Sequence, residues 1–246
     1  MNKRWHASWT RVGLALLIVF GALYALYGVT IELTPWYQAR SMCRDNPFVK
    51  LVPVPLPDQG VAPLAGTRLE ADGFSIQFPW SEAPQRRNGK TLDVIAFPTR
   101  GVGMILFGPS QTAYSAAYPQ IRKSAGEILG EETAHSRYQL TAAELAASPD
   151  QVRWWKAPRE NAKYFYLLAM KSMILQNWGC VYILNQGNVR GFQVGDPAKP
   201  PYRVDLRLFD SDDREYEILI TPKSKAASSF SQAEVNAIVA SLQPNP

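Results

Sequence analysis

The chain has 246 residues and a formal net charge of +5, with 26 lysines and arginines against 21 aspartates and glutamates. The basic residues form no run or stripe of the kind that binds nucleic acid, so the composition argues against a DNA- or RNA-binding role. The length suits one globular domain with its own hydrophobic core.

An apolar run near the start of the chain is its most distinctive feature. Residues Val12–Ile31 carry no charge and are bounded by Arg11 and Glu32. At about 1.5 Å per residue, a helix over this run would be about 30 Å long, which is the thickness of the hydrocarbon core of a bilayer. The run therefore predicts a transmembrane helix over residues 12–31.

The charges on either side of the run predict its orientation. Lys3, Arg4 and Arg11 precede it without an acidic neighbour, whereas the charges that follow are mixed. By the positive-inside rule, residues 1–11 are expected to be a cytoplasmic tail and the rest to be periplasmic, in a single-pass protein of the inner membrane. The apolar run lacks the polar segment that surrounds a cleavage site, which favours an uncleaved anchor over a cleaved signal peptide.

Prolines dominate the next segment, residues 32–66. The stretch Leu51–Pro63 has four prolines among apolar residues. Proline at this density favours extended backbone and opposes helix, so we expect a semi-rigid juxtamembrane linker that acts as a spacer. A proline-rich docking ligand is the alternative, although the stretch has no P-x-x-P motif beside a basic residue.

Residues 67–246 are predicted to form strands, then helices, then further strands and a last helix. Period-two alternation or short apolar runs predict strands at Gly73–Pro79, Leu92–Phe97, Val102–Phe107, Cys180–Leu184, Val189–Val194, Tyr202–Phe209 and Glu215–Thr221. Helical spacing and capping patterns predict helices over Thr112–Gly130 and Pro158–Gln176, after Thr141 and Ser148, and after Ser231.

Segregated blocks of strands and helices predict an extracytoplasmic α+β domain over residues 67–246. Its antiparallel sheet is expected to carry packed helices, as in an α/β sandwich. In the last two strands, Leu206 and Leu208 alternate with Asp205 and Arg207. We therefore expect an antiparallel hairpin with one apolar face and one face in water.

Two segments of this domain resemble the Mog1/PsbP-like fold. One is the opening strand GFSIQFPW (Gly73–Trp80), and the other is the closing hairpin and helix, REYEILITP to VNAIVASL (Arg214–Leu242). The resemblance covers about half of the domain. It implies a binding or accessory module rather than an enzyme, and it assigns no functional residue.

The sequence contains no recognisable catalytic motif. A thiol dyad of Cys180 with His135 is one arrangement that it leaves open, but nothing singles these two residues out. Asp210, Asp212 and Asp213 bring carboxylates together without the glycine and glutamate of a calcium loop. No metal site and no cofactor are therefore expected.

Two further groups of residues are candidates for a structural or binding role. Cys43 and Cys180 are the two cysteines, and an even number in an oxidising compartment permits a disulfide, with two free thiols as the alternative. Arg153-Trp154-Trp155-Lys156 forms a candidate interaction surface, since two adjacent tryptophans cannot both face one core. The alternative is that both rings fill a gap between helices.

Together these features predict a membrane-anchored, non-enzymatic binding or accessory protein of the bacterial cell envelope that contacts another protein. One alternative is an extracytoplasmic small-molecule or lipid binder, with an apolar cavity lined by residues such as Phe165 and Met173. The other is a hydrolase whose active site is not visible in the sequence.

Overall fold

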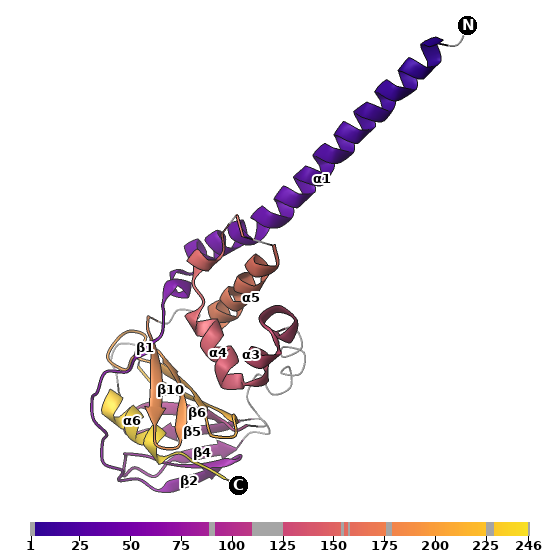
Figure 1. The fold of residues 1–246 in the computed structure, drawn as a ribbon. Helices are drawn as coiled ribbons and strands as arrows, with labels where there is room; N and C mark the ends of the chain where they lie inside the picture. Colours follow the sequence, from indigo (N-terminus) through magenta and orange to yellow (C-terminus); the bar gives the residue numbers. More distant parts are fainter. Residues whose placement is uncertain are drawn as a thin grey trace.

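The computed structural model describes residues 3–88, 92–109, 125–153, 155–156, 158–175, 179–224 and 229–245, and the fold is α+β (Figure 1). The strands are β1 Val54–Pro55, β2 Arg68–Ala71, β3 Phe74–Gln77, β4 Gln85–Asn88, β5 Asp93–Phe97, β6 Val102–Phe107, β7 Val181–Gln186, β8 Val189–Val194, β9 Val204–Phe209, β10 Glu215–Pro222 and β11 Gln243–Pro244. The helices are α1 Lys3–Asp45, α3 Glu131–His135, α4 Arg137–Ala146, α5 Pro158–Leu175 and α6 Gln232–Ser241, with short 3-10 helices η1 Pro47–Lys50 and η2 Pro149–Gln151.

An eight-stranded sheet forms the centre of the molecule. Its strand order is β1-β7-β8-β9-β10-β6-β5-β4, and a second sheet has the order β11-β3-β2. All neighbouring strands are antiparallel except β1, which pairs parallel with β7. The predicted α+β class is confirmed, but the large sheet is mixed rather than purely antiparallel.

One face of the large sheet is covered by α6 and the small sheet. The alternate residues of β9 and β10 that face this way are buried and apolar: Val204, Leu206, Leu208 and Ile218. They pack in one cluster with Val235 and Ile238 of α6. Helix α6 begins with a capping box, in which Ser231 and Glu234 satisfy each other's backbone N–H groups. Both the helix and its cap agree with the sequence prediction.

The other face of the sheet carries α4 and α5. Leu145 and Ile174 of these helices pack in one cluster with Phe192 and Phe209 of the sheet. The ring of Tyr138, in the first turn of α4, stacks on Phe192 at a centroid distance of 5.5 Å. The hairpin face that the alternation of β9 and β10 predicts to be in water is therefore buried beneath helices.

The N-terminus of α4 is held by the turn between β9 and β10. Asp213 accepts hydrogen bonds from the Ser136 hydroxyl at 3.0 Å and from the Tyr138 N–H at 3.1 Å. Ser136 is the N-cap, so the capping box predicted at Thr141 and Glu144 is wrong. Both residues lie inside the helix and are buried, because the helix begins five residues earlier and turns them toward the core.

Of the helix predicted over Thr112–Gly130, residues 112–124 lie outside the described residues, and 125–129 are helical.

The proline-rich stretch is part of the fold and is not a free spacer. Its residues Val54 and Pro55 form β1 at the edge of the large sheet. Further along, the Leu56 N–H donates to the Ile183 carbonyl at 3.3 Å, and Asn236 Nδ2 donates to the Gly60 carbonyl at 2.8 Å. The backbone is extended, as expected. The segment lies along the domain instead of standing free, because its backbone groups form hydrogen bonds with the domain.

Helix α1 projects from the domain at its N-terminal end, and its C-terminal part packs against α5 (Figure 1). Several side chains along the projecting part are exposed, among them Ile18, Phe20 and Leu26. In the part of the chain that the structure describes, no helix combines the length and the apolar character needed to cross a bilayer.

This finding contradicts the transmembrane helix predicted over residues 12–31, and with it the single-pass signal-anchor. The structure also lacks the boundary that the prediction placed after Ile31. Helix α1 continues through the polar and charged residues beyond that point to Asp45, where it belongs to the domain core: Ala39 is buried among helix residues such as Leu167 and Leu168.

Candidate functional site: a basic aromatic pocket

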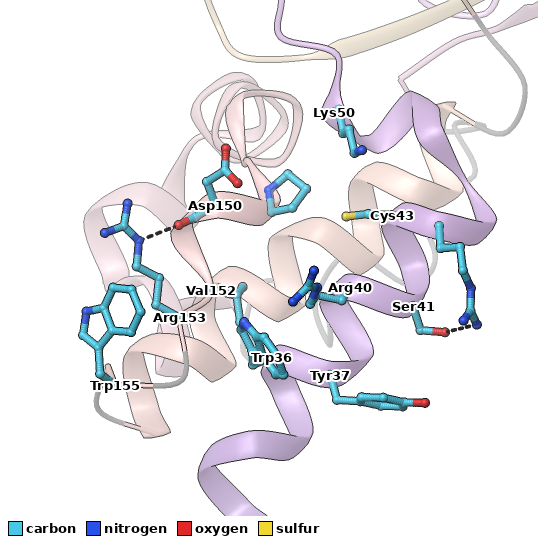
Figure 2. Close-up of a pocket in the computed structure, with 12 residues that line it drawn as sticks. Trp36, Tyr37, Arg40, Ser41, Cys43, Lys50, Asp150, Val152, Arg153 and Trp155 are labelled. Carbon is cyan, nitrogen blue, oxygen red and sulfur yellow. Dashed lines mark hydrogen bonds between the residues drawn. The ribbon is translucent and has the colours of Figure 1, made fainter.

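A cavity of about 1000 Å³ lies between the C-terminal part of α1 and the segment that connects η2 to α5 (Figure 2). This volume is at the upper end of the range for ligand sites in proteins, about 300–1000 Å³. One wall is helical and the other is a loop, so a different local sequence shapes each wall.

The α1 wall presents aromatic and basic side chains on one helical face. Trp36, Arg40 and Arg44 follow one another at intervals of four residues, which places them one above the other along the helix. The guanidinium carbon of Arg40 lies 5.0 Å from the centroid of the Trp36 ring, within cation–π range. Tyr37 lines the cavity beside them and is 67% exposed.

The loop wall repeats this pairing of an arginine with a tryptophan. The guanidinium carbon of Arg153 lies 5.3 Å from the centroid of the Trp155 ring, and Trp155 is 62% exposed. Arg153 Nε also donates to the Asp150 carbonyl at 2.9 Å (Figure 2). The two walls thus each place one arginine guanidinium over a tryptophan ring, which is the sense in which these arginines are called stacked below.

A buried asparagine fixes the conformation of the loop wall. Asn161, in the first turn of α5, accepts from the Arg153 N–H at 3.1 Å and donates to the Arg153 carbonyl at 2.8 Å. Ahead of the loop, Ser148 and Gln151 form the predicted capping box, which starts the short helix η2. Because Asn161 is fully buried, its hydrogen bonds hold the loop against the domain core.

A buried lysine links the segment after η1 to the segment before η2, next to lining residues of the cavity. Lys171 Nζ donates to the Ala147 carbonyl at 2.7 Å, just ahead of η2, and also to the carbonyl of Leu51, the residue after Lys50. Lys171 is fully buried, and burial lowers its pKa to about 8. This side chain therefore ties α5 to the chain on both sides of the cavity.

Positive charge predominates in the cavity lining. Among the described lining residues, Arg40, Arg44, Lys50 and Arg153 are basic and Asp150 is acidic. Arg44 pairs with Asp45 at 3.3 Å, where both side chains are largely exposed and the pair is therefore weak. The arrangement suits an anionic ligand with an aromatic or apolar part.

The structure places the predicted interaction surface partly in this cavity. Arg153 and Trp155 line it, whereas Lys156 is directed to α5, where its Nζ lies 4.8 Å from the centroid of the Tyr164 ring. Trp154 lies outside the described residues. The sequence analysis missed the α1 wall, although the four-residue spacing of Trp36, Arg40 and Arg44 was a usable signal.

The two cysteines are free thiols with different neighbours. Cys43 lines the cavity, where burial raises the pKa of its thiol. Cys180 lies just ahead of β7, where burial also raises its pKa and Tyr182 is its hydrogen-bond partner. The structure does not bring the sulfurs together in a bond, so the disulfide stays a prediction from the sequence.

The residues considered for catalysis or metal binding do not form a site. His135 is 61% exposed at the side chain and lies 3.8 Å from Glu131, its neighbour on α3, rather than beside Cys180. Asp210 accepts from the Arg214 guanidinium at 2.7 Å and the Tyr216 hydroxyl at 2.8 Å, so it is engaged within the hairpin. Among the described residues, no group of three or more histidine, cysteine or acidic side chains is placed to hold a metal ion.

Comparison with known proteins adds no assignment: no family model, no curated protein and no solved structure matches the chain. The resemblance to the Mog1/PsbP-like fold therefore remains a prediction from the sequence pattern.

Proposed function

We propose that this chain is a non-enzymatic binding protein whose pocket holds an acidic segment of a partner protein. The observation that carries the proposal is the pair of stacked arginines on opposite walls, Arg40 on Trp36 and Arg153 on Trp155. Arg44 and Lys50 add to the positive charge of the same lining.

The chemistry of a stacked arginine supports this choice. A guanidinium that stacks through its plane keeps its N–H edge for a carboxylate, and the stacking reduces the conformational entropy lost on binding. Arginine, tryptophan and tyrosine are also the residues that contribute most to binding energy at protein interfaces. All three types line this pocket, and the tryptophan and tyrosine rings offer contacts to apolar side chains beside the acidic ones.

An apolar ligand is less well supported by the residues that were expected to line its cavity. Met173 is 66% exposed, and Phe165 packs among the helices α1, α4 and α5 instead of facing a cavity. A small anionic molecule shares the chemistry of an acidic segment, and the experiment below separates the two.

Site-specific photo-crosslinking tests the proposal in the full chain. A photoreactive phenylalanine analogue replaces Tyr37, which lines the pocket and is exposed. We expect covalent adducts with a protein, and we expect mass spectrometry to place the crosslinked residue in an acidic segment of that protein. Adducts confined to neutral or basic segments, or no protein adduct from cells that express the chain, would contradict the proposal.

Charge reversal supplies the matched control. Arg40→Glu and Arg153→Glu each place a negative charge in the pocket, so we expect the adduct to fall by about tenfold or more, the range found when a hot-spot residue is lost. Arg87→Glu makes the same change on the exposed edge strand β4 and should leave the adduct unchanged. An adduct that survives both pocket variants would place the partner elsewhere.

A further inference from the structure

A second group of charged side chains lies on the helix-covered face of the sheet, separate from the pocket lining, and all of its members are buried except Glu217, which is half-buried. Asp205 and Arg207 of β9 and Glu215 and Glu217 of β10 face the same way, and Glu144 approaches them from α4. Glu217 lies directly opposite Arg207 in the strand register. We refer to these five residues as the carboxyl cluster.

Aromatic side chains flank the carboxyl cluster within the sheet. In the register, Phe192 lies beside Arg207 on β8, and Phe107 lies beside Glu217 on β6. Glu144 is 1% exposed and Glu215 is 3% exposed. A carboxylate in such a site costs several kcal/mol unless a cation or donors compensate it.

Compensation within the cluster is incomplete. The Arg207 guanidinium lies 3.9 Å from Glu215 Oε1, at the long end of an ion pair. Among the described residues, Glu144 Oε1 and Asp205 Oδ1 have no hydrogen-bond partner. The other charged or titratable groups that face the cluster are Arg137 on α4, Tyr166 on α5, Arg203 ahead of β9 and Asp213 in the β9–β10 turn.

We propose that the carboxyl cluster is a pH-sensitive clamp, which holds α4 on the sheet while its carboxyl groups are protonated and loosens the helix as they ionise. Glu144 is the member that belongs to the helix, and the other four belong to the sheet. Ionisation of Glu144 therefore introduces a negative charge between the two layers, opposite the carboxyl groups of β9 and β10, and Arg207 compensates this charge only in part.

The direction of the pKa shifts agrees with this clamp. Burial raises the pKa of Glu144 from an ordinary value of 4.5 to about 8 and that of Glu217 to about 7. Burial also raises the pKa of Asp205 and of Glu215. A carboxyl group whose pKa is raised on folding stabilises the fold most below its unfolded pKa, and this stabilisation is lost as the pH rises through the raised value. The clamp should therefore loosen between about pH 5 and about pH 8.

Hydrogen exchange of the full chain tests this prediction with an internal reference. Protection of α4, measured relative to the intrinsic exchange rate at each pH, is compared with protection of α6 on the opposite face of the sheet. Between about pH 5.5 and about pH 8.5 we expect α4 to lose at least tenfold more protection than α6, which corresponds to one pKa unit of linkage. Equal changes in the two helices, or greater protection of α4 at high pH, would overturn the proposal.

Glu144→Gln tests the residue assignment, because an amide cannot ionise. We expect the pH-dependent loss in α4 to shrink at least threefold in this variant, whereas Glu160→Gln, at an exposed position of α5, should behave as the wild type. If Glu144→Gln does not fold, Glu217→Gln gives the same comparison. A wild-type pH response in the folded variant would overturn the assignment. Neither outcome depends on the pocket, so the clamp and the proposed function fail independently.

Discussion

The two faces of the large sheet are formed by the same strands but bury different kinds of side chain. The face beneath α6 is an apolar core in which the rings of Phe78, Trp80 and Phe97 contact one another, with centroids 4.7 to 6.3 Å apart. The face beneath α4 and α5 carries a cluster of carboxyl groups, and the segment that connects these two helices forms one wall of an open basic pocket. Stability is concentrated on one face, and the groups that can bind or respond to the solution are concentrated on the other.

Strand β9 shows the difference within a single element. Its residues Val204, Leu206 and Leu208 point to the apolar core, and the alternate residues Asp205 and Arg207 point to the helices. A buried charge is stabilising only when it is fully paired, whereas a buried leucine stabilises without a partner. The helical layer should therefore be the less stable of the two, and substitutions on the two faces should separate stability from binding.

The largest expected effect comes from the apolar face. Phe78→Ala removes a fully buried ring from the aromatic contacts and should lower the free energy of unfolding by about 3–5 kcal/mol. Urea unfolding measures the change, and Phe78→Leu, which keeps most of the volume, should cost clearly less. The folded fraction of the Phe78→Ala protein should still bind in the pocket. Loss of binding by that fraction would contradict the expectation that substitutions on the apolar face change stability without changing binding.

Lys171→Met should have an intermediate effect. The substitution keeps the aliphatic chain but removes the donors of two buried carbonyl groups, which should lower the free energy of unfolding by about 2 kcal/mol near neutral pH. Because burial lowers the pKa of Lys171 to about 8, its ionisation opposes folding below that pH and ceases to do so as the pH rises toward 10.5.

The pH profile distinguishes this explanation from a simple loss of packing. In the wild type, Lys171 contributes a rise in stability between about pH 8 and about pH 10.5, and the methionine variant should lack that rise. The same variant should also weaken binding in the pocket, since Lys171 holds the chain next to the lining residues Lys50 and Pro149. Unchanged binding would show that the walls are positioned by other contacts.

Ser231→Ala should have the smallest effect of the three. It removes the N-cap of α6, where the serine hydroxyl accepts from the Glu234 N–H at 3.3 Å, and should cost about 1 kcal/mol. Thermal unfolding measures the loss, and Ser231→Asp, which restores an acceptor, should recover most of it. Binding in the pocket should not change, because α6 lies on the other face.

Much of the fold could be predicted from local sequence patterns. The strands β5, β6 and β8 match their predicted ranges to within one residue, and the described residues of the predicted helix Pro158–Gln176 are all helical, as α5. These elements carry their own signals: period-two alternation, apolar runs bounded by glycine or proline, and helical spacing. The capping box of Ser231 with Glu234 likewise depends on residues only three apart.

The partners against which an element packs could not be predicted in this way. Alternation in β9 and β10 showed that one face is polar, but it did not show that α4 and α5 bury that face. Thr141 and Glu144 fit a capping pattern, yet the true cap is completed by Asp213, which is distant in sequence. The apolar run after Arg11 suggested a separate anchor, whereas α1 continues into the domain and supplies a wall of the pocket.

Direct titration of the pocket with a defined peptide is the sharpest test of the proposed binding of an acidic segment. The probe is a labelled twelve-residue peptide of glutamate and aspartate around one phenylalanine, and its control has glutamine and asparagine at the acidic positions. We expect fluorescence anisotropy to show binding of the acidic peptide alone, weakened at least tenfold by Arg40→Glu or Arg153→Glu and by raising the salt from about 0.05 to about 0.5 M. Equal binding of the two peptides, or acidic-peptide binding that both variants retain, would contradict the account.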